Sequence, residues 1–158
     1  MSALPQATVA FRPMSAADID AIMEVELAAY EFPWTPAIFR DCLRVGYCCW
    51  VLSHSNEIDG YGIMTVGAGE CHILNLCIRP QLQNLGLGRA LMEHLLELAV
   101  EHQADTAFLE VRPSNPVAIK LYDNLGFNQV GLRRRYYPAE YGREDALILA
   151  KSIRAHDC

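Results

Sequence analysis

The sequence QNLGLGR at residues 83–89 has the composition of an anion-binding loop. It follows a predicted strand that ends at Ile78 and precedes a predicted helix that starts near Leu87. Gly86 and Gly88 let the backbone turn tightly, so several N–H groups can point to one place at the positive end of the helix dipole. Such a cradle suits a pyrophosphate. The spacing matches neither G-x-G-x-x-G nor G-K-[ST], so the loop is a phosphate cradle of another class or a plain glycine turn.

A glutamate stands in the middle of an apolar predicted strand at 106–111. A buried carboxylate is costly unless it is paired or used, and strand alternation places Glu110 on one face with Phe108 and Arg112. An ion pair with a nearby arginine explains this residue about as well as catalysis does. Tyr122 lies on the next predicted helix, and a tyrosine at helical spacing among apolar residues is more often a core residue than a catalytic one.

Two aromatic groups fall in predicted connections between elements. They are Tyr30, Phe32, Pro33 and Trp34 between two helices, and Tyr136, Tyr137 and Tyr141 in the last hairpin connection. Each group alone favours packing, but together they could form the walls of a groove for an extended peptide.

These residues need a mixed α/β scaffold to position them. The predicted order is one strand, two helices, a meander of three strands, then helix, strand, helix and two closing strands. Capping signals support the helices, with Thr35 and Pro36 before the second and Asn115 and Pro116 before the last. We predict one central sheet, mostly antiparallel and of about six to seven strands, with helices on both faces. The predicted strands are 9–12, 47–53, 61–66, 71–78, 106–111, 127–137 and 144–151.

Composition favours a single globular domain over residues 1–158, since 52% of the residues are hydrophobic and 20% are charged. No apolar run is long enough to span a membrane, and the first residues lack a signal-peptide pattern, so we expect a cytoplasmic protein with no membrane partner. The net charge of -6 argues against direct nucleic-acid binding. The basic run Arg133, Arg134 and Arg135 is either a solvated strand end or a means of steering an acidic stretch of a partner.

The six cysteines show neither C-x-x-C pairs nor a zinc-type ligand set, so we expect reduced thiols and no metal. They are Cys42, Cys48, Cys49, Cys71, Cys77 and Cys158.

Taken together, three motifs resemble the GNAT superfamily of acetyl-CoA-dependent N-acetyltransferases. They are Q-x-x-G-x-G between strand and helix, the strand glutamate, and N-x-x-A-x-x-L-Y-x-x-x-G-F from Asn115 to Phe127. The likeness covers about residues 9–153, and it implies a GNAT-like fold with acetyl-CoA as co-substrate. Three longer segments resemble, more narrowly, the bacterial members that acetylate the N-terminal alanine of the eighteenth small-subunit ribosomal protein. They are FPWTPAIF (32–39), LEVRPSNPVAIKLYDNLGF (109–127) and RRRYYPAEYGREDALIL (133–149).

The resemblance implies a role for each matching residue. Glu110 would be the general base and Tyr122 the general acid, and Cys77 would be a packing residue because the family transfers the acetyl group directly. Asn84 stands where the family usually carries arginine, which removes one cation from the loop and leaves its backbone donors. The implied cofactor contacts are Leu76, Cys77 and Ile78 at the pantetheine arm and thioester carbonyl, Asn84, Leu85, Gly86, Leu87, Gly88 and Arg89 at the pyrophosphate, and Asn115 near the thiol. The implied substrate contacts are Phe32, Trp34, Tyr136 and Tyr137.

The resemblance makes the N-terminal peptide of that ribosomal protein the expected partner. An α-amino group titrates near 8 and a lysine near 10.4, so freeing the lysine amine costs about 3 kcal/mol more, and a glutamate base is better matched to an N-terminal amine. Two alternatives stay open. One is the same chemistry on a small-molecule amine or a protein lysine, and the other is a CoA-binding module without catalysis. Nothing in the sequence indicates an oligomeric state.

Overall fold

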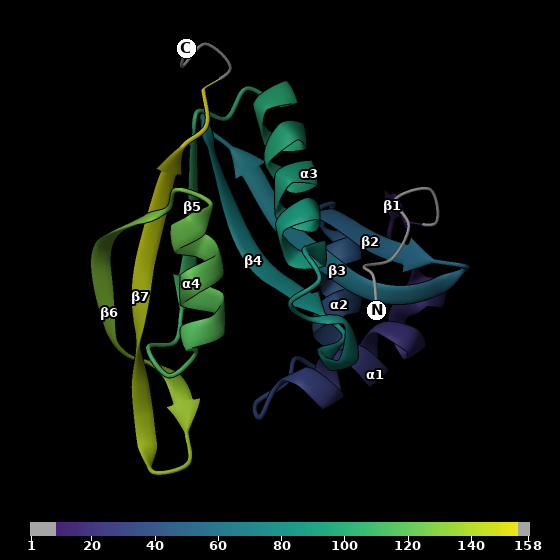
Figure 1. Cartoon of the computed structure of the whole chain (residues 1–158), viewed down its shortest axis with the longest axis horizontal. Coiled ribbons are helices and arrows are strands. Elements are labelled where there is room, and N and C mark those ends of the chain that lie inside the picture. The colour runs from purple at the N-terminus through teal and green to yellow at the C-terminus, as the bar shows by residue number, and fades with distance from the viewer. Residues whose placement is uncertain (1–8, 155–158) are drawn as a thin grey trace. The chain divides into compact units, whose positions relative to one another are not determined.

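A computed structural model describes residues 9–154, and these residues form seven strands and four α-helices (Figure 1). The strands are β1 (Val9–Pro13), β2 (Cys48–His54), β3 (Glu57–Gly67), β4 (Glu70–Ile78), β5 (Thr106–Val111), β6 (Asn128–Ala139) and β7 (Gly142–Ser152). The helices are α1 (Ile19–Ala29), α2 (Pro36–Arg44), α3 (Leu87–Glu101) and α4 (Pro116–Asn124). The predicted order of elements is therefore confirmed.

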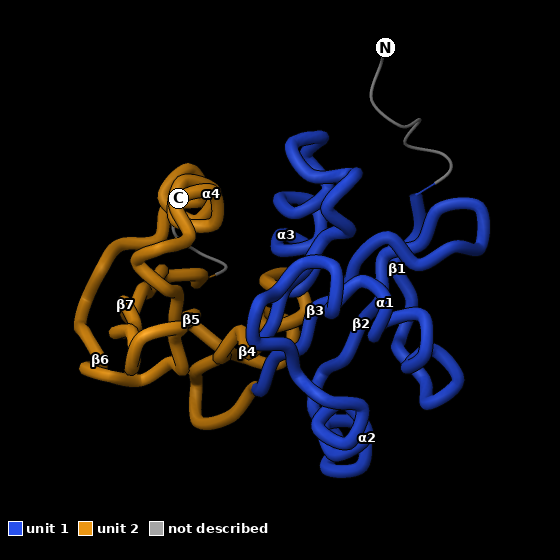
Figure 2. Tube along the Cα trace, turned by 90° about the horizontal axis from the view of Figure 1, so that it is seen from below, with its two compact units in different colours: residues 1–65, 75–95 blue, residues 66–74, 96–158 orange. Residues whose placement is uncertain are grey.

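The strands are hydrogen-bonded in the order β1-β2-β3-β4-β5-β7-β6. The β1–β2, β2–β3, β5–β7 and β6–β7 pairs are antiparallel, whereas β4 and β5 run parallel. A mostly antiparallel mixed sheet is thus confirmed. Of the described residues, 9–65 and 75–95 form a first compact unit and 66–74 and 96–154 a second (Figure 2), so β3, β4 and α3 contribute to both. That the whole chain is one domain stays a prediction.

In the first unit, helices cover both faces of the strands. Ile22 of α1 and Phe39 of α2 are fully buried in a cluster that includes Val51 of β2. The next residue of β2, Leu52, belongs to a second cluster with Leu91 of α3, because successive side chains of a strand point to opposite faces. Burial of each such side chain contributes about 1.5–3 kcal/mol.

The hairpin between β2 and β3 is tighter than predicted. The polar segment 55–60 was expected to form the whole connection, but only Ser55 and Asn56 turn, with φ of 51° and 69°. Both values fit a two-residue hairpin turn of the type whose twist matches the strands. Asp59 is only 3% exposed within β3. A Cβ at Gly60 would come within 2.8 Å of a backbone carbonyl of β4, so this glycine allows close strand contact rather than a turn.

The predicted helix caps are confirmed. The Thr35 hydroxyl accepts the Ile38 N–H at 3.3 Å, and Oδ1 of Asn115 accepts the Ala118 N–H at 3.2 Å. Gly126, after α4, has a φ of 93°, the left-handed conformation common after a helix. These caps fix where α2 and α4 begin, and so where the residues around them lie.

The cysteines of residues 9–154 are free thiols. Cys158 lies outside the described residues. Within the same range, no group of three or more His, Cys, Asp and Glu side chains could hold a metal ion. No helix there is long and apolar enough to cross a membrane.

Candidate active site

The glycine loop of the first unit has the backbone geometry of an anion cradle. Asn84 and Gly86 have positive φ values of 67° and 85°. Asparagine and glycine are the residues that adopt this conformation most readily, which accounts for asparagine at this position. The loop leads directly into α3 at Leu87, where the first N–H groups have no intrahelical acceptor and the helix dipole is positive. Apart from Gly86 and its neighbours in the chain, no heavy atom of residues 9–154 lies within 4 Å of a Cβ built on Gly86, so a phosphate could approach the backbone here.

The side chains of this loop offer fewer groups for binding an anion than its backbone N–H groups do. Arg89 lies 3.5 Å from Glu93 one turn along α3, and both side chains are half exposed. Because Asn84 is uncharged, the N–H groups of the loop are the main donors of the cradle. The loop therefore fits a pyrophosphate chiefly through its main chain.

We expect Gly86→Val to weaken CoA binding by about tenfold or more, because a β-branched residue at positive φ costs 1 kcal/mol or more and shifts the loop. Gly46→Val is the matched control, since Gly46 has a φ of 83° and open space around its Cβ but follows α2. Calorimetric titration with CoA measures both. Equal affinity in wild type and Gly86→Val would contradict the cradle.

The last residues of β4 are predicted to face the cofactor. The Leu76 carbonyl accepts a hydrogen bond from the Tyr30 hydroxyl at 3.2 Å, and the Ile78 carbonyl accepts one from Nε2 of Gln83 at 3.1 Å. Cys77 between them is 4% exposed. Burial is the main cause that raises the pKa of its thiol to about 11, and the negative charge of the nearby Glu26 acts in the same direction. A protonated thiol is a poor nucleophile at neutral pH, which supports a packing role for Cys77.

The predicted substrate residues of the first unit differ in their surroundings. Phe32 is 38% exposed. Trp34 is partly buried, and its ring packs on Phe39 with 5.3 Å between ring centroids. Its backbone N–H donates to the carboxylate of Glu26 at 2.8 Å. Phe32 is therefore the more accessible of the two for a peptide, and Trp34 belongs largely to the core.

In the second unit, Glu110 of β5 forms an ion pair with an arginine, which was the predicted alternative to a catalytic role. Its Oε1 lies 3.3 Å from Nε of Arg133, with the glutamate side chain 14% exposed and the arginine 53% exposed. Arg133 is thus not simply part of a solvated strand end. Beyond it, β6 bulges between Arg133 and Tyr137, and Arg135 at the bulge has a φ of 53°.

Tyr137 lies near this carboxylate, and Tyr122 lies near Tyr137. Tyr122 of α4 is 8% exposed and packs at an angle against Phe127, with 6.0 Å between centroids. Burial raises the pKa of Tyr137, and the negative charge of Glu110 adds to the effect, with a smaller contribution from Tyr122. The ring centroids of Tyr136 and Tyr137 lie 4.9 Å apart. The second unit therefore brings the predicted base, the predicted acid and both hairpin tyrosines into one neighbourhood.

Two charged residues for which no role was predicted, Arg112 and Glu144, also contact this neighbourhood. The Arg112 guanidinium lies 4.4 Å from the centroid of the Tyr137 ring and 3.1 Å from Oε1 of Glu144. Glu144 also accepts the Ser114 N–H at 2.8 Å. Asn115 follows directly, and its Oδ1 is taken by the helix cap, so a cofactor contact would fall to its Nδ2. The GRED motif at 142–145 was the available signal.

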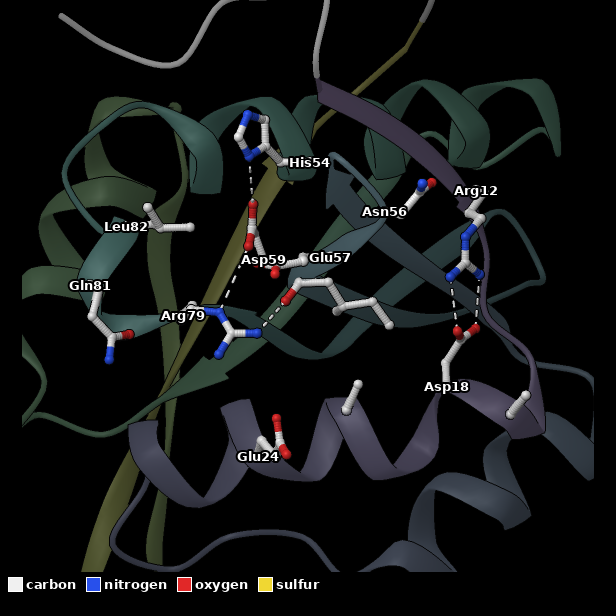
Figure 3. Close-up of a pocket in the computed structure, with 13 residues that line it drawn as sticks. Arg12, Asp18, Glu24, His54, Asn56, Glu57, Asp59, Arg79, Gln81 and Leu82 are labelled. Atoms are coloured by element: carbon white, nitrogen blue, oxygen red, sulfur yellow. Dashed lines mark hydrogen bonds and ion pairs between the residues drawn. The ribbon is translucent and has the colours of Figure 1, made fainter.

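An open depression of about 690 Å³ also lies in the first unit, between α1 and the β2–β3 turn (Figure 3). None of the predicted site residues lines it. Four of its charged side chains pair with one another, Arg12 with Asp18 at 2.8 Å and Asp59 with Arg79 at 3.7 Å. Burial raises the pKa of Asp59, and the neighbouring Arg79 and His54 oppose that rise. Its residues are therefore separate from those of the predicted site.

Comparisons with known proteins agree with these features. Residues 19–127 match the acetyltransferase (GNAT) family. The chain is 39% identical to RimI, the [ribosomal protein bS18]-alanine N-acetyltransferase of Escherichia coli K12, over 136 aligned residues. The alignment covers 86% of this chain and 92% of the relative. The crystal structure of the ribosomal-protein-S18-alanine N-acetyltransferase from Escherichia coli matches with a TM-score of 0.85 at 36% identity, over 92% of this chain and 94% of that one.

A more distant structure, Arabidopsis thaliana NAA60 in complex with acetyl-CoA, shares the fold with a TM-score of 0.81 at 19% identity, over 92% of this chain and 99% of that one. The glycine loop before α3, the strand glutamate and the matched residues lead to one conclusion: this chain belongs to the acetyltransferase (GNAT) family.

Proposed function

We propose that this acetyltransferase moves the acetyl group of acetyl-CoA to the N-terminal alanine amine of ribosomal protein bS18, in the cytoplasm. The observation that carries the proposal is the 39% identity, over 86% of the chain, to a relative that bears this activity in its name. The cradle before α3 supports the cofactor, since its positive-φ residues and open approach fit a pyrophosphate.

When bound, acetyl-CoA supplies a thioester carbonyl that an amine can attack. Glu110 takes the proton that the amine nitrogen loses as its bond to the acetyl carbon forms. Tyr122 gives its hydroxyl proton to the sulfur as the carbon–sulfur bond breaks, so each proton has a named donor and acceptor. Glu110 is a better candidate for the base than Cys77. The Cys77 thiol is buried and protonated, whereas the Glu110 side chain is partly open to solvent.

The acceptor would lie against exposed aromatic side chains. Phe32 and Tyr136 are 38% and 46% exposed, and Tyr141 is 90% exposed at the tip of the β6–β7 hairpin. Amphipathic rings of this kind suit a peptide whose own backbone supplies most hydrogen bonds. The pairing of Arg133 with Glu110 leaves Arg134 and Arg135 as the members of the basic run that could meet an acidic partner.

The test is to incubate purified bS18 carrying a free N-terminal alanine with the enzyme and acetyl-CoA, and then to locate any added acetyl group by fragmentation mass spectrometry. We expect one acetyl group on the terminal amine. A bS18 sample with a blocked terminus is the control, and it should gain none. An acetyl group on a lysine would identify a side-chain acetyltransferase instead.

Failure to modify bS18 together with turnover of free amines would favour a small-molecule acceptor. CoA binding without turnover of any amine would indicate a binding module. Each of these results would overturn the proposed function.

A further inference from the structure

A buried carboxylate in the first unit plays no part in the proposed transfer chemistry. Glu26 of α1 is 1% exposed, on the face of the helix that otherwise carries apolar residues into the core. A carboxylate removed from water costs several kcal/mol unless hydrogen bonds replace its hydration. Three donors do so here. They are the Tyr61 hydroxyl at 2.6 Å and Nδ2 of Asn75 at 3.1 Å, both to Oε1, and the Trp34 N–H at 2.8 Å to Oε2.

This residue holds the loop 30–35 at both of its ends. The loop has no regular secondary structure before α2, and Pro33 within it has no N–H to donate. At its start, the Tyr30 N–H donates to the backbone carbonyl of Glu26 at 3.1 Å. At its end, the Trp34 N–H donates to the carboxylate of the same residue. Phe32, an expected contact of the acceptor, lies between these two bonds.

The same carboxylate also orients groups at β4. Because Nδ2 of Asn75 donates to Glu26, its Oδ1 faces the Tyr30 hydroxyl, which lies 3.2 Å away. That hydroxyl is equally far from the carbonyl of Leu76. Tyr61 remains a donor, since burial and then the neighbouring Cys77 and Glu26 raise its pKa. The three hydrogen bonds of the carboxylate thus come from the loop and from strands β3 and β4.

We propose that Glu26 is a positioning residue that sets the conformation of the loop 30–35 and thereby the recognition of the acceptor peptide. It contacts neither substrate itself. The inference rests on the proposed function, because the peptide is the acceptor named there. It adds a residue whose effect is on the acceptor rather than on the cofactor or on the proton transfers.

The sharpest variant is Glu26→Gln, which has the same shape. All three partners present hydrogens, so whichever way the amide turns, its NH₂ group meets an N–H of Trp34 or Asn75. One unmet buried donor costs enough to raise the KM for an alanine-led peptide about tenfold, with kcat and the Kd for CoA each within about threefold of wild type. Discrimination between alanine-led and other peptides should fall as well, because a loosened loop selects its ligand less strictly.

Two control variants separate this role from general effects. Glu24→Gln makes the same change on the exposed side of α1 and should leave the acceptor KM unaltered. Tyr61→Phe removes one donor from Oε1 but leaves the Trp34 bond to Oε2, so its acceptor KM should stay within about threefold of wild type. If Glu26→Gln does not fold, Glu26→Met fills the same space without an acceptor for Trp34 and should show the same rise in KM.

Hydrogen exchange of the Trp34 amide, followed by mass spectrometry on the free enzyme, tests the positioning without any substrate. We expect faster exchange in the Glu26 variants and wild-type exchange in Tyr61→Phe. Unchanged exchange and KM would overturn the inference, as would a parallel loss of kcat and CoA affinity, which indicates a general core defect. If wild type itself fails to acetylate the peptide, the proposed function fails, and the exchange result still decides the role of Glu26.

Discussion

Replacing Glu110 with glutamine is expected to lower kcat by about 100-fold or more while the Kd for CoA changes little. Glutamine keeps the size of the side chain but cannot take a proton from the attacking amine. The variant also loses the pairing with Arg133, yet that arginine is 53% exposed, and such pairs contribute at most about 1 kcal/mol. Folding should therefore survive, and the loss should fall on turnover.

Arg133→Gln is the control for Glu110, because it removes the same ion pair and keeps the carboxylate. Steady-state rates with an alanine-led peptide, CoA titrations and thermal unfolding would be compared for both variants. A catalytic base predicts a large fall in kcat for Glu110→Gln alone. Equal falls in the two variants would instead assign Glu110 a purely structural role.

Tyr122→Phe should also reduce kcat by about 100-fold, since it deletes the hydroxyl that supplies a proton to the departing sulfur. The ring is retained, so its packing on Phe127 and the buried position of the side chain are preserved. Thermal unfolding should change little, and CoA should bind as in wild type. Rates and binding would be measured under the same conditions as for Glu110.

Tyr47→Phe provides the matched comparison for Tyr122. It deletes the same atom from a side chain that is 41% exposed and belongs to no predicted site, and kcat should be unchanged. If Tyr122→Phe kept full turnover, water would have to protonate the thiolate, and the tyrosine would be the core residue that its spacing first suggested.

Much of the fold could be predicted because its signals are local. Asn115 and Pro116 start α4 through a cap that reaches only three residues ahead, and the glycine after α4 ends it. The start of β3 could not be predicted in the same way. Asp59 and Gly60 are residue types that favour turns. Their places in β3 depend on distant contacts, the pairing of Asp59 with Arg79 and the close approach of β4 to Gly60.

The site shows the same division between local and distant information. The glycine loop and the residues of α4 follow from motifs, whereas the partner of Glu110 lies 23 positions further along, at Arg133, on a strand two places away in the sheet. Glu26 stands out in the sequence only as a polar residue on an apolar helix face. Its donors are 8, 35 and 49 residues away, so no spacing rule could have assigned it a role.

The double attachment of the loop 30–35 to one residue of α1 has a practical consequence for engineering. Both attachments use main-chain N–H groups, at Tyr30 and Trp34, and therefore persist whatever side chains stand between them. Residues 31 and 32 can therefore be varied while both bonds are kept. If Phe32 contacts the acceptor as proposed, a library randomised at those two positions, with Glu26 kept, should yield enzymes that accept other peptide termini.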